Sequence, residues 1–428
     1  ITIAYILILN PQILADPYVI MGDDVMAGKI SNGVFIGTCI GAFIGTILCA
    51  LYAKVPFAQA PGMGLNAFFA YTVVLAMGYT YNQALVIVFI SGIFFIVITA
   101  VGLREAIIRS IPDAVKMAIT PGIGLFITII GLKNSGLVVG NSATLVSMVD
   151  FAQWRSEDGD VSLICGALVA LIGLIVIGVL NARNVKGSII IGILVATVAG
   201  IPLGVTKLSS FDMNLGAKFS DFAEVSLFKM DFAGLFAGEN IVSTIFTVVM
   251  LVLSFSLVNM FDSIGTLMGA ARQSGMIDEN GEIIHMKEAL MSDAISTAAG
   301  AMVGTSTVTT VVESSAGIAA GGRTGMTSLV TAVMFLASII FAPIVSIVPG
   351  QATAPALIFV GILMLSNIKE VDFSEMSNAL PAFCTVVFMP FTYSIANGVA
   401  VGLITYCFMK LFTGKASEIK ALTWIISI

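Results

Sequence analysis

The sequence has few charged residues and a single histidine, His285. Charged residues make up 10% of the 428 residues, whereas a soluble domain usually carries about 25%. Metal sites and nucleophile–base pairs need clustered His, Cys or Asp side chains, and the apolar segments contain no histidine. We therefore expect no metal, no cofactor and no enzymatic activity.

Cysteine is also scarce, and the charge balance has no basic excess. The five cysteines stand in apolar segments without paired spacing, which excludes a disulfide framework. The formal net charge is −6, so nucleic acid is not expected as a partner.

Apolar residues dominate the chain. Hydrophobic residues make up 58% and the mean hydropathy is +1.06, as in an all-α polytopic membrane protein. The sequence opens in an apolar run that we expect to belong to the first span. In all, fourteen apolar segments are predicted to be spans: 1–10 (cut short), 33–53, 58–78, 82–103, 115–133, 161–180, 187–201, 241–271, 289–306, 308–322, 325–346, 353–367, 378–396 and 397–413.

The basic residues predict the orientation of these spans. If both termini are cytoplasmic, thirteen of the nineteen Lys and Arg residues fall on the cytoplasmic side, as the positive-inside rule requires. The connections 11–32, 134–160 and 202–240 are then external. We expect a multi-pass protein of the plasma or inner membrane, in contact with lipid.

Fourteen spans divide into two sevens at the connection 202–240. Because seven is odd, a duplicated second half enters from the opposite side, which predicts an inverted repeat. A faint internal similarity agrees: Thr120-Pro-Gly-Ile-Gly-Leu-Phe126 resembles Thr353-Ala-Pro-Ala-Leu-Ile-Phe359.

The third and tenth spans have sequences typical of broken helices. Pro61 and Gly62 interrupt the third span shortly before Asn66, and the β-branched run 307–312 favours extended backbone in the tenth. Such backbone is tolerated inside a membrane only where protein or a watery cavity satisfies its polar groups. We expect the two breaks to face each other across one cavity.

Two acids stand alone in long apolar stretches. No other charged residue occurs at 241–271 around Asp262, or at 294–322 around Glu313. Each acid lies ten residues before an arginine, Arg272 or Arg323, which is ~15 Å of helix and half the thickness of a bilayer core. Intramembrane carboxylates usually mark a ligand or ion path. A buried carboxylate that takes up a proton can couple proton and substrate occupancy.

Three segments carry a family resemblance that covers nearly the whole chain. They are Ala60-Pro-Gly-Met-Gly-Leu-Asn-Ala-Phe-Phe-Ala-Tyr71, Phe261-Asp-Ser-Ile-Gly-Thr-Leu267 and Val312-Glu-Ser-Ser-Ala-Gly-Ile-Ala-Ala-Gly-Gly-Arg-Thr-Gly325. The chain resembles the azaguanine-type (AzgA-like) purine permeases of the nucleobase/ascorbate transporter (nucleobase:cation symporter-2) family.

The resemblance implies fourteen spans in two inverted repeats, with a core domain moving against a gate domain. The expected division is 1–110 core (spans 1–4), 111–204 gate (spans 5–7), 205–240 external connection, 241–348 core (spans 8–11) and 349–428 gate (spans 12–14). It also implies import of adenine, guanine or hypoxanthine by proton symport. Some members of the family carry a further acid at the position of Asn259, so the proton stoichiometry stays open.

The resemblance assigns the site as well. Glu313 is expected to be the main substrate acceptor, and Asp262 to share substrate binding or proton coupling with it. Substrate contacts are expected from Asn66, Phe68, Phe261, Thr266, Val312 and Ser314. Structural alternatives stand beside these roles: Asn66 as a helix cap, the phenylalanines as packing residues, and Thr266 bonded back to its own helix.

Other functions compete with nucleobase transport. A carrier of another neutral or anionic solute on the same fold is one alternative, although two carboxylates would repel an anion. An ion channel and a membrane enzyme are the others. The expected partners are a purine base and H⁺, with Na⁺ and a homodimer left open.

Overall fold

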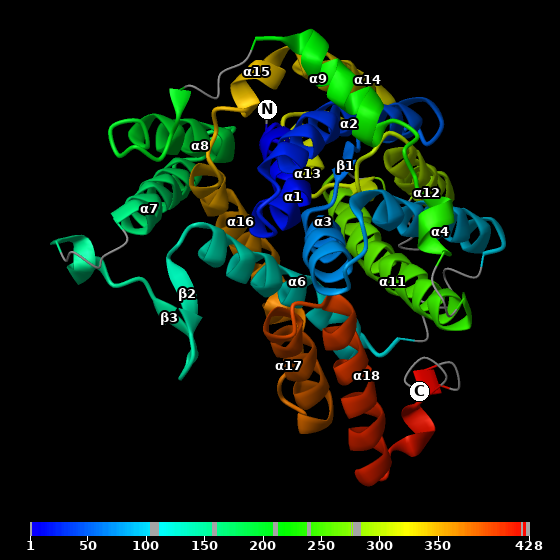
Figure 1. Ribbon diagram of the computed structural model, residues 1–428. Helices are drawn as coiled ribbons and strands as arrows, with labels where there is room; N and C mark the ends of the chain where they lie inside the picture. The colour runs from blue at the N-terminus through cyan, green and yellow to red at the C-terminus, as the bar shows by residue number, and fades with distance from the viewer. Residues whose placement is uncertain are drawn as a thin grey trace.

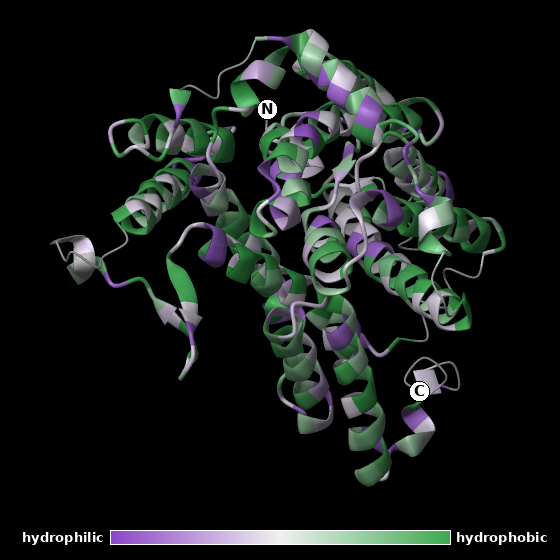
Figure 2. Ribbon diagram, in the orientation of Figure 1, coloured by the Kyte–Doolittle hydropathy of each residue, from purple (hydrophilic) through white to green (hydrophobic). Residues whose placement is uncertain are grey.

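The computed structural model describes residues 2–102, 111–155, 161–208, 213–237, 241–274, 276, 284–420 and 423–424. Within these residues, eight helices are long and apolar enough to cross a membrane, and three shorter apolar helices accompany them. Much of the helical ribbon carries the green of hydrophobic residues in Figure 2. A multi-pass helical membrane protein is therefore confirmed, while the count of fourteen spans stays a prediction.

The long helices pack in two groups (Figure 1). The first, here called the core group, comprises α1 (Tyr5–Ile20), α2 (Asp24–Leu51), α4 (Tyr81–Ala100), α11 (Ile241–Ser274), α12 (Met286–Met302) and α14 (Gly325–Ala337). The second, here called the gate group, comprises α6 (Asp113–Asn134), α7 (Val161–Ala182), α8 (Ser188–Ala199), α16 (Gly350–Leu365), α17 (Met376–Phe391) and α18 (Ile395–Phe412). The predicted domain boundaries run along this division and remain a prediction.

Glycines set the closest helix contacts in both groups. A Cβ atom on Gly92 of α4 would lie 2.6 Å from the backbone nitrogen of Ala298 in α12. A Cβ atom on Gly361 of α16 would lie 2.6 Å from the carbonyl oxygen of Gly124 in α6. Small residues let membrane helices approach until their backbones touch, and packing then replaces the hydrophobic drive that lipid removes.

The first two helices are longer than predicted, so the expected connection at 11–32 is wrong. The helix α1 continues to Ile20, through Pro11 and Pro17, and α2 begins at Asp24. Asp16 lies in the predicted connection and Asn10 at the end of the predicted first span, and both have side-chain partners elsewhere in the molecule. Satisfied in this way, they are compatible with a membrane helix.

The remaining elements are short. They are the hairpin β2 (Val138–Asn141) and β3 (Leu145–Met148), the 3-10 turns η2 (Phe151–Arg155), η5 (Ser338–Phe341), η6 (Ser366–Glu370) and η7 (Ala416–Glu418), the helices α9 (Leu215–Asp221), α10 (Phe232–Leu235) and α15 (Ala342–Val345), and the π-turn η4 (Phe222–Ser226).

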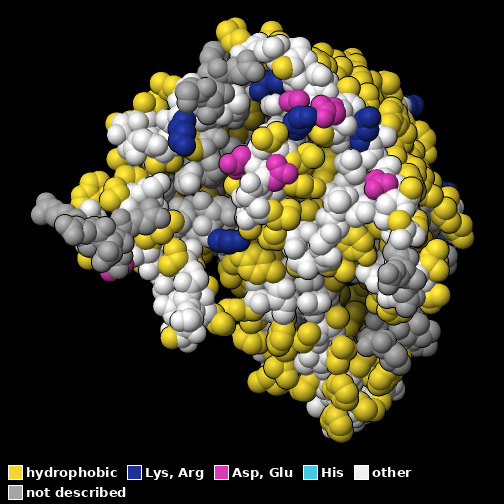
Figure 3. Space-filling model, in the orientation of Figure 1, with side chains coloured by type: hydrophobic (Ala, Val, Ile, Leu, Met, Phe, Trp, Pro, Cys, Tyr) yellow, Lys and Arg dark blue, Asp and Glu magenta, His cyan; other side chains and the backbone are white. Residues whose placement is uncertain are grey.

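Residues 213–237, here called the strap, cover one end of the core group. Lys29 of α2 forms an ion pair of 2.5 Å with Glu224. The backbone N–H of Phe228 donates to the carbonyl of Met302, at the end of α12, over 2.8 Å. Charged side chains gather on this part of the surface, in the upper half of the view in Figure 3. The strap therefore belongs to the core group.

Candidate functional site

The third and tenth spans are both broken, as predicted, and their breaks pair with each other. The strand β1 (Gln59–Pro61) runs antiparallel to β4 (Val308–Thr310), with Gln59 opposite Thr310. Helix α3 (Met63–Ala67) follows β1 and continues as the π-helix η1 (Phe68–Ala76). Proline and glycine end the strand in the third span, and β-branched residues favour extended backbone in the tenth.

The tenth span resumes as a helix after a short turn. Helix α13 (Ser314–Ala319) begins directly after Glu313. The carboxylate therefore stands at the point where the extended backbone becomes helical. Asn66 occupies a comparable place in the third span, inside α3.

The extended backbone is satisfied by neighbouring polar groups. The N–H of Gly62 donates to the carbonyl of Thr307 over 3.1 Å, beyond the end of the strand pair. The hydroxyl of Thr46 in α2 bonds both the N–H and the carbonyl of Gln59, each over 3.0 Å. These contacts replace water for backbone that lies between apolar helices.

Glu313 is half-buried and held by a tyrosine from the first helix. The hydroxyl of Tyr5 donates to Oε1 of Glu313 over 2.5 Å. The Tyr5 side chain is only 1% exposed, so this contact is an interior one. Charge-assisted hydrogen bonds of this kind are about twice as strong as neutral ones.

Asn66 is fully buried and is also held by α1. Its Nδ2 donates to Oδ1 of Asn10 over 2.5 Å, and Asn10 in turn donates to Thr38 and Thr305 over 2.7 and 2.9 Å. The Oδ1 atom of Asn66 has no hydrogen-bond partner in the described part of the chain. An unpaired buried acceptor is costly, and it is available to a donor on a ligand.

Asp262 lies on α11 beside the break in the third span. It is half-buried, and its Oδ2 is 3.7 Å from the position that a Cβ atom on Gly62 would occupy. Its carboxyl group interacts electrostatically with those of Glu313 and Asp293. The structure thus brings together the two acids that the sequence places at one depth, and adds a third.

Asp293 is the site residue that sequence reasoning missed. It is fully buried on α12. Its Oδ1 accepts from the N–H of Thr310 over 2.8 Å, and its Oδ2 accepts from the hydroxyl of Ser263. A signal for it existed, because Asp293 falls inside the predicted span 289–306. Tyr5 and Asn10 carried no comparable signal.

Two of the other predicted contacts use their hydroxyl groups within the protein. Thr266 donates to the backbone carbonyls of Asp262 and Ser263, each over 2.9 Å. Ser314 accepts from the N–H of Ala58 over 3.0 Å. Both hydroxyls therefore support the backbone around the break.

The predicted apolar contacts differ in exposure. Phe68 is 1% exposed and meets Phe255 of α11 edge to face, with ring centroids 4.8 Å apart. Val312 is 54% exposed. The side chain of Phe261 lies outside the described residues.

The donors and acceptors at the break suit a small polar ligand better than a metal. Carboxyl groups, an amide and hydroxyls surround it, and no group of His, Cys, Asp or Glu side chains in the described ranges is arranged to hold a metal ion. Carboxylates accept hydrogen bonds, and an amide both accepts and donates. A ligand with N–H groups beside ring acceptors matches this set.

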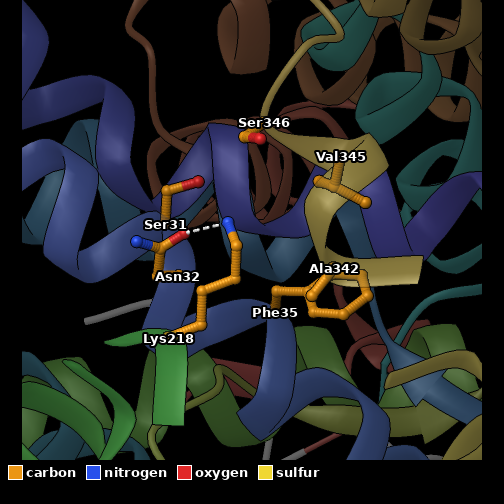
Figure 4. A pocket seen from close by; sticks show the side chains of 7 residues that line it. All are labelled: Ser31, Asn32, Phe35, Lys218, Ala342, Val345 and Ser346. Atoms are coloured by element: carbon orange, nitrogen blue, oxygen red, sulfur yellow. Dashed lines mark hydrogen bonds between the residues drawn. The ribbon is translucent and has the colours of Figure 1, made fainter. Parts of the chain in front are cut away.

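One small cavity lies elsewhere, between α2, α9 and α15 (Figure 4). Lys218 donates to Asn32 there over 3.0 Å. The cavity offers about 10 Å³, room for roughly one water molecule. It is too small for a solute such as a purine and is separate from the broken spans.

The profile of the Permease family (Xan_ur_permease) matches residues 2–424. The chain is 38% identical to the adenine permease AdeQ of Escherichia coli, over 100% of this chain and 88% of that protein. It is also 38% identical to the guanine/hypoxanthine permease PbuO of Bacillus subtilis, over 100% of this chain and 93% of that protein.

Two solved structures share the fold. The transmembrane domain of the cyanobacterial bicarbonate transporter BicA superimposes with a TM-score of 0.61 at 17% identity, over 92% of this chain and 95% of that one. SLC26A9 gives 0.62 at 13% identity, over 96% and 64%. The predicted inverted-repeat fold with core and gate domains is thereby confirmed.

Proposed function

The chain belongs to the Xan_ur_permease family of nucleobase and ascorbate transporters, and from that membership we propose that it imports purine nucleobases by proton symport. It is a permease and not an enzyme. The relatives named above act on adenine or on guanine and hypoxanthine. The observation that carries the proposal is that Asn66 and Glu313 follow the paired strands of the third and tenth spans, with Asp262 beside Gly62.

The chemistry of these side chains favours a neutral, donor-rich ligand. A purine base presents ring and exocyclic N–H donors beside nitrogen and oxygen acceptors. Glu313 accepts from the donors, and the amide of Asn66 pairs with a further group. Because Asp262 interacts electrostatically with both Asp293 and Glu313, an anionic substrate would be repelled.

The other predicted residues complete the proposed site. Phe68 and Phe261 are proposed to give the base apolar contacts, and Val312 directly precedes Glu313 in the chain. Thr266 and Ser314 act through the backbone that they hold. Asp262 exchanges the coupled proton with the aqueous phases. Because its charge interacts with the other acids of the site, the loss or gain of that proton changes how strongly the site binds the base.

Alternating access is proposed because the two helix groups meet in a polar contact at one end. Tyr71 of η1 donates to Oδ2 of Asp16 over 2.7 Å and accepts from Asn134 of α6 over 3.1 Å. The hydroxyl of Thr72 donates to the carbonyl of Tyr393, between α17 and α18, over 2.7 Å. These residues, here called the latch, join the core group to the gate group.

The latch lies at the end that the basic residues predict to be external. Lys133 adds a cation above the rings of Tyr71 and Tyr393, 5.8 and 6.0 Å from their centroids. Tyr393 holds a positive φ of 51°, a conformation that a large side chain adopts only when its surroundings enforce it. For a base to enter from outside, these contacts must separate, so this conformation is closed on that side.

A competition assay tests the proposal. Purified protein in proteoliposomes with an imposed pH gradient, acid outside, is expected to accumulate radiolabelled hypoxanthine. Excess unlabelled adenine or guanine should compete, uracil should compete poorly, and a protonophore should abolish accumulation. Failure of every base to compete would overturn the proposal, and uptake that never exceeds equilibrium would favour a channel.

A further inference from the structure

Tyr5 is not among the residues that the sequence predicts for the site, yet it touches the proposed acceptor directly. Its hydroxyl donates to Oε1 of Glu313 over 2.5 Å. A donor from the protein itself therefore occupies part of the acceptor capacity that a base would use.

We propose that Tyr5 is a specificity-determining residue that makes Glu313 favour a base with one N–H donor on the recognised edge over a base with two adjacent donors. This inference rests on the proposed function. It concerns the relative affinity of that one site for different purine bases.

The chemical reason is the number of carboxylate oxygens left open. Guanine presents N1–H and the 2-amino group side by side, and such a pair binds both oxygens of a carboxylate at once. Hypoxanthine presents N1–H alone on that edge, so one oxygen is enough. With Tyr5 on Oε1, hypoxanthine pairs with Oε2 alone, whereas guanine needs both oxygens and must share Oε1 with the phenol.

The position of Tyr5 makes it a firm competitor. Its ring is buried at the first residue of α1, and α1 is fixed one and a half turns later by the bonds of Asn10 to Thr38 and Thr305. A phenol displaced from Glu313 would leave a buried donor without a partner. That loss costs as much as the hydrogen bond contributes, or more.

The test is Tyr5→Phe, which removes the hydroxyl and keeps the ring. The KM values for guanine and hypoxanthine uptake are measured in proteoliposomes, and their ratio is compared with that of the wild type. The wild type is expected to have the lower KM for hypoxanthine. In Tyr5→Phe the ratio of the guanine KM to the hypoxanthine KM should fall roughly three- to tenfold, the worth of one hydrogen bond.

Tyr18→Phe is the matched control. Tyr18 is also on α1, and its hydroxyl accepts from the N–H of Tyr81 over 3.0 Å, away from Glu313. This variant should leave the ratio unchanged even if it lowers overall uptake. A change in the ratio of the same size in both variants would show a general effect of α1 and overturn the proposal.

Each further outcome is decisive. Equal shifts of both KM values in Tyr5→Phe, with a constant ratio, would make Tyr5 purely structural. If Tyr5→Phe does not reach the membrane, the wild-type order decides, because a lower KM for guanine than for hypoxanthine contradicts the proposal. A wild type that transports neither base overturns the proposed function instead.

Discussion

The third and tenth spans have the same backbone plan and different chemistry. Each enters the site as a short strand, pairs with the other through Gln59 and Thr310, and resumes as a helix. The third span presents a neutral amide, Asn66, which is fully buried. The tenth presents an acid, Glu313, which is half-buried. A repeated backbone thus carries two chemically different halves of the proposed binding site.

The two spans also differ on the far side of the break. Beyond Asn66 the helical backbone continues through η1 to Ala76 and carries Tyr71 and Thr72 of the latch. Beyond Glu313, α13 ends at Ala319. The helix of the tenth span therefore ends soon after its charged residue. The helix of the third span continues from the proposed site to the contact between the two helix groups.

Removing the charge of the tenth span is the most severe test of this contrast. Glu313→Gln should lower hypoxanthine uptake by roughly 10- to 100-fold, because a charge-assisted hydrogen bond to the base is lost. Initial rates in proteoliposomes measure the effect. Glu224→Gln, on the exposed strap, should transport like the wild type. Full uptake by Glu313→Gln would remove the acid of the tenth span from the proposed site.

The second-largest effect is expected at Asp262, the acid of α11 beside the break in the third span. Asp262→Asn keeps a polar side chain beside Gly62 but cannot exchange a proton. Accumulation against a gradient should fall to equilibrium, while exchange of labelled for unlabelled base across the membrane continues. Gradient-driven uptake measures the accumulation and counterflow measures the exchange, both on the same vesicles. Gradient-driven accumulation at the wild-type level would show that Asp262 is not the coupling acid.

The amide of the third span should matter less than the acid of the tenth. Asn66→Ala removes neutral hydrogen bonds only, so the KM for hypoxanthine should rise roughly three- to tenfold. Asn141→Ala, in the turn of the exposed hairpin, is a suitable control. If Asn66→Ala lowered hypoxanthine uptake more than Glu313→Gln does, the amide of the third span would matter more than the acid of the tenth, and the prediction would be wrong.

The smallest effect is expected at the latch. Thr72→Val removes the bond to the carbonyl of Tyr393, so the external side should open more readily. A cysteine at Ser394 should then react about two- to fivefold faster with an impermeant thiol reagent. Thr331→Val is the matched control, because Thr331 bonds within its own helix, α14. An unchanged reaction rate would mean that Thr72 does not help to close that side.

The broken spans and the isolated acids were predictable because their signals are local. Pro61 and Gly62 disrupt a helix wherever they occur together, and a β-branched run favours a strand. Asp262 and Glu313 stand out because hydrophobic neighbours surround them on both sides. Their common depth in the membrane followed from counting residues to the nearest arginine.

The role of α1 could not be predicted, because it depends on partners far along the chain. Tyr5 meets Glu313 across 308 positions, and Asn10 meets Thr305 across 295. Asp16, whose partner Tyr71 lies far along the chain, was assigned to a connection, so the first span was predicted too short. Tertiary contacts override local polarity wherever a buried group finds a match.

The strap has a practical consequence for following motion. It is anchored to α2 and α12 and contains none of the residues proposed to bind the substrate. Phe219 on the strap is 44% exposed, so a fluorophore attached there would report the displacement of one helix group relative to a second label on the β2–β3 hairpin. The permease thus offers two labelling positions, one on each helix group, and neither is among the residues proposed to bind the substrate.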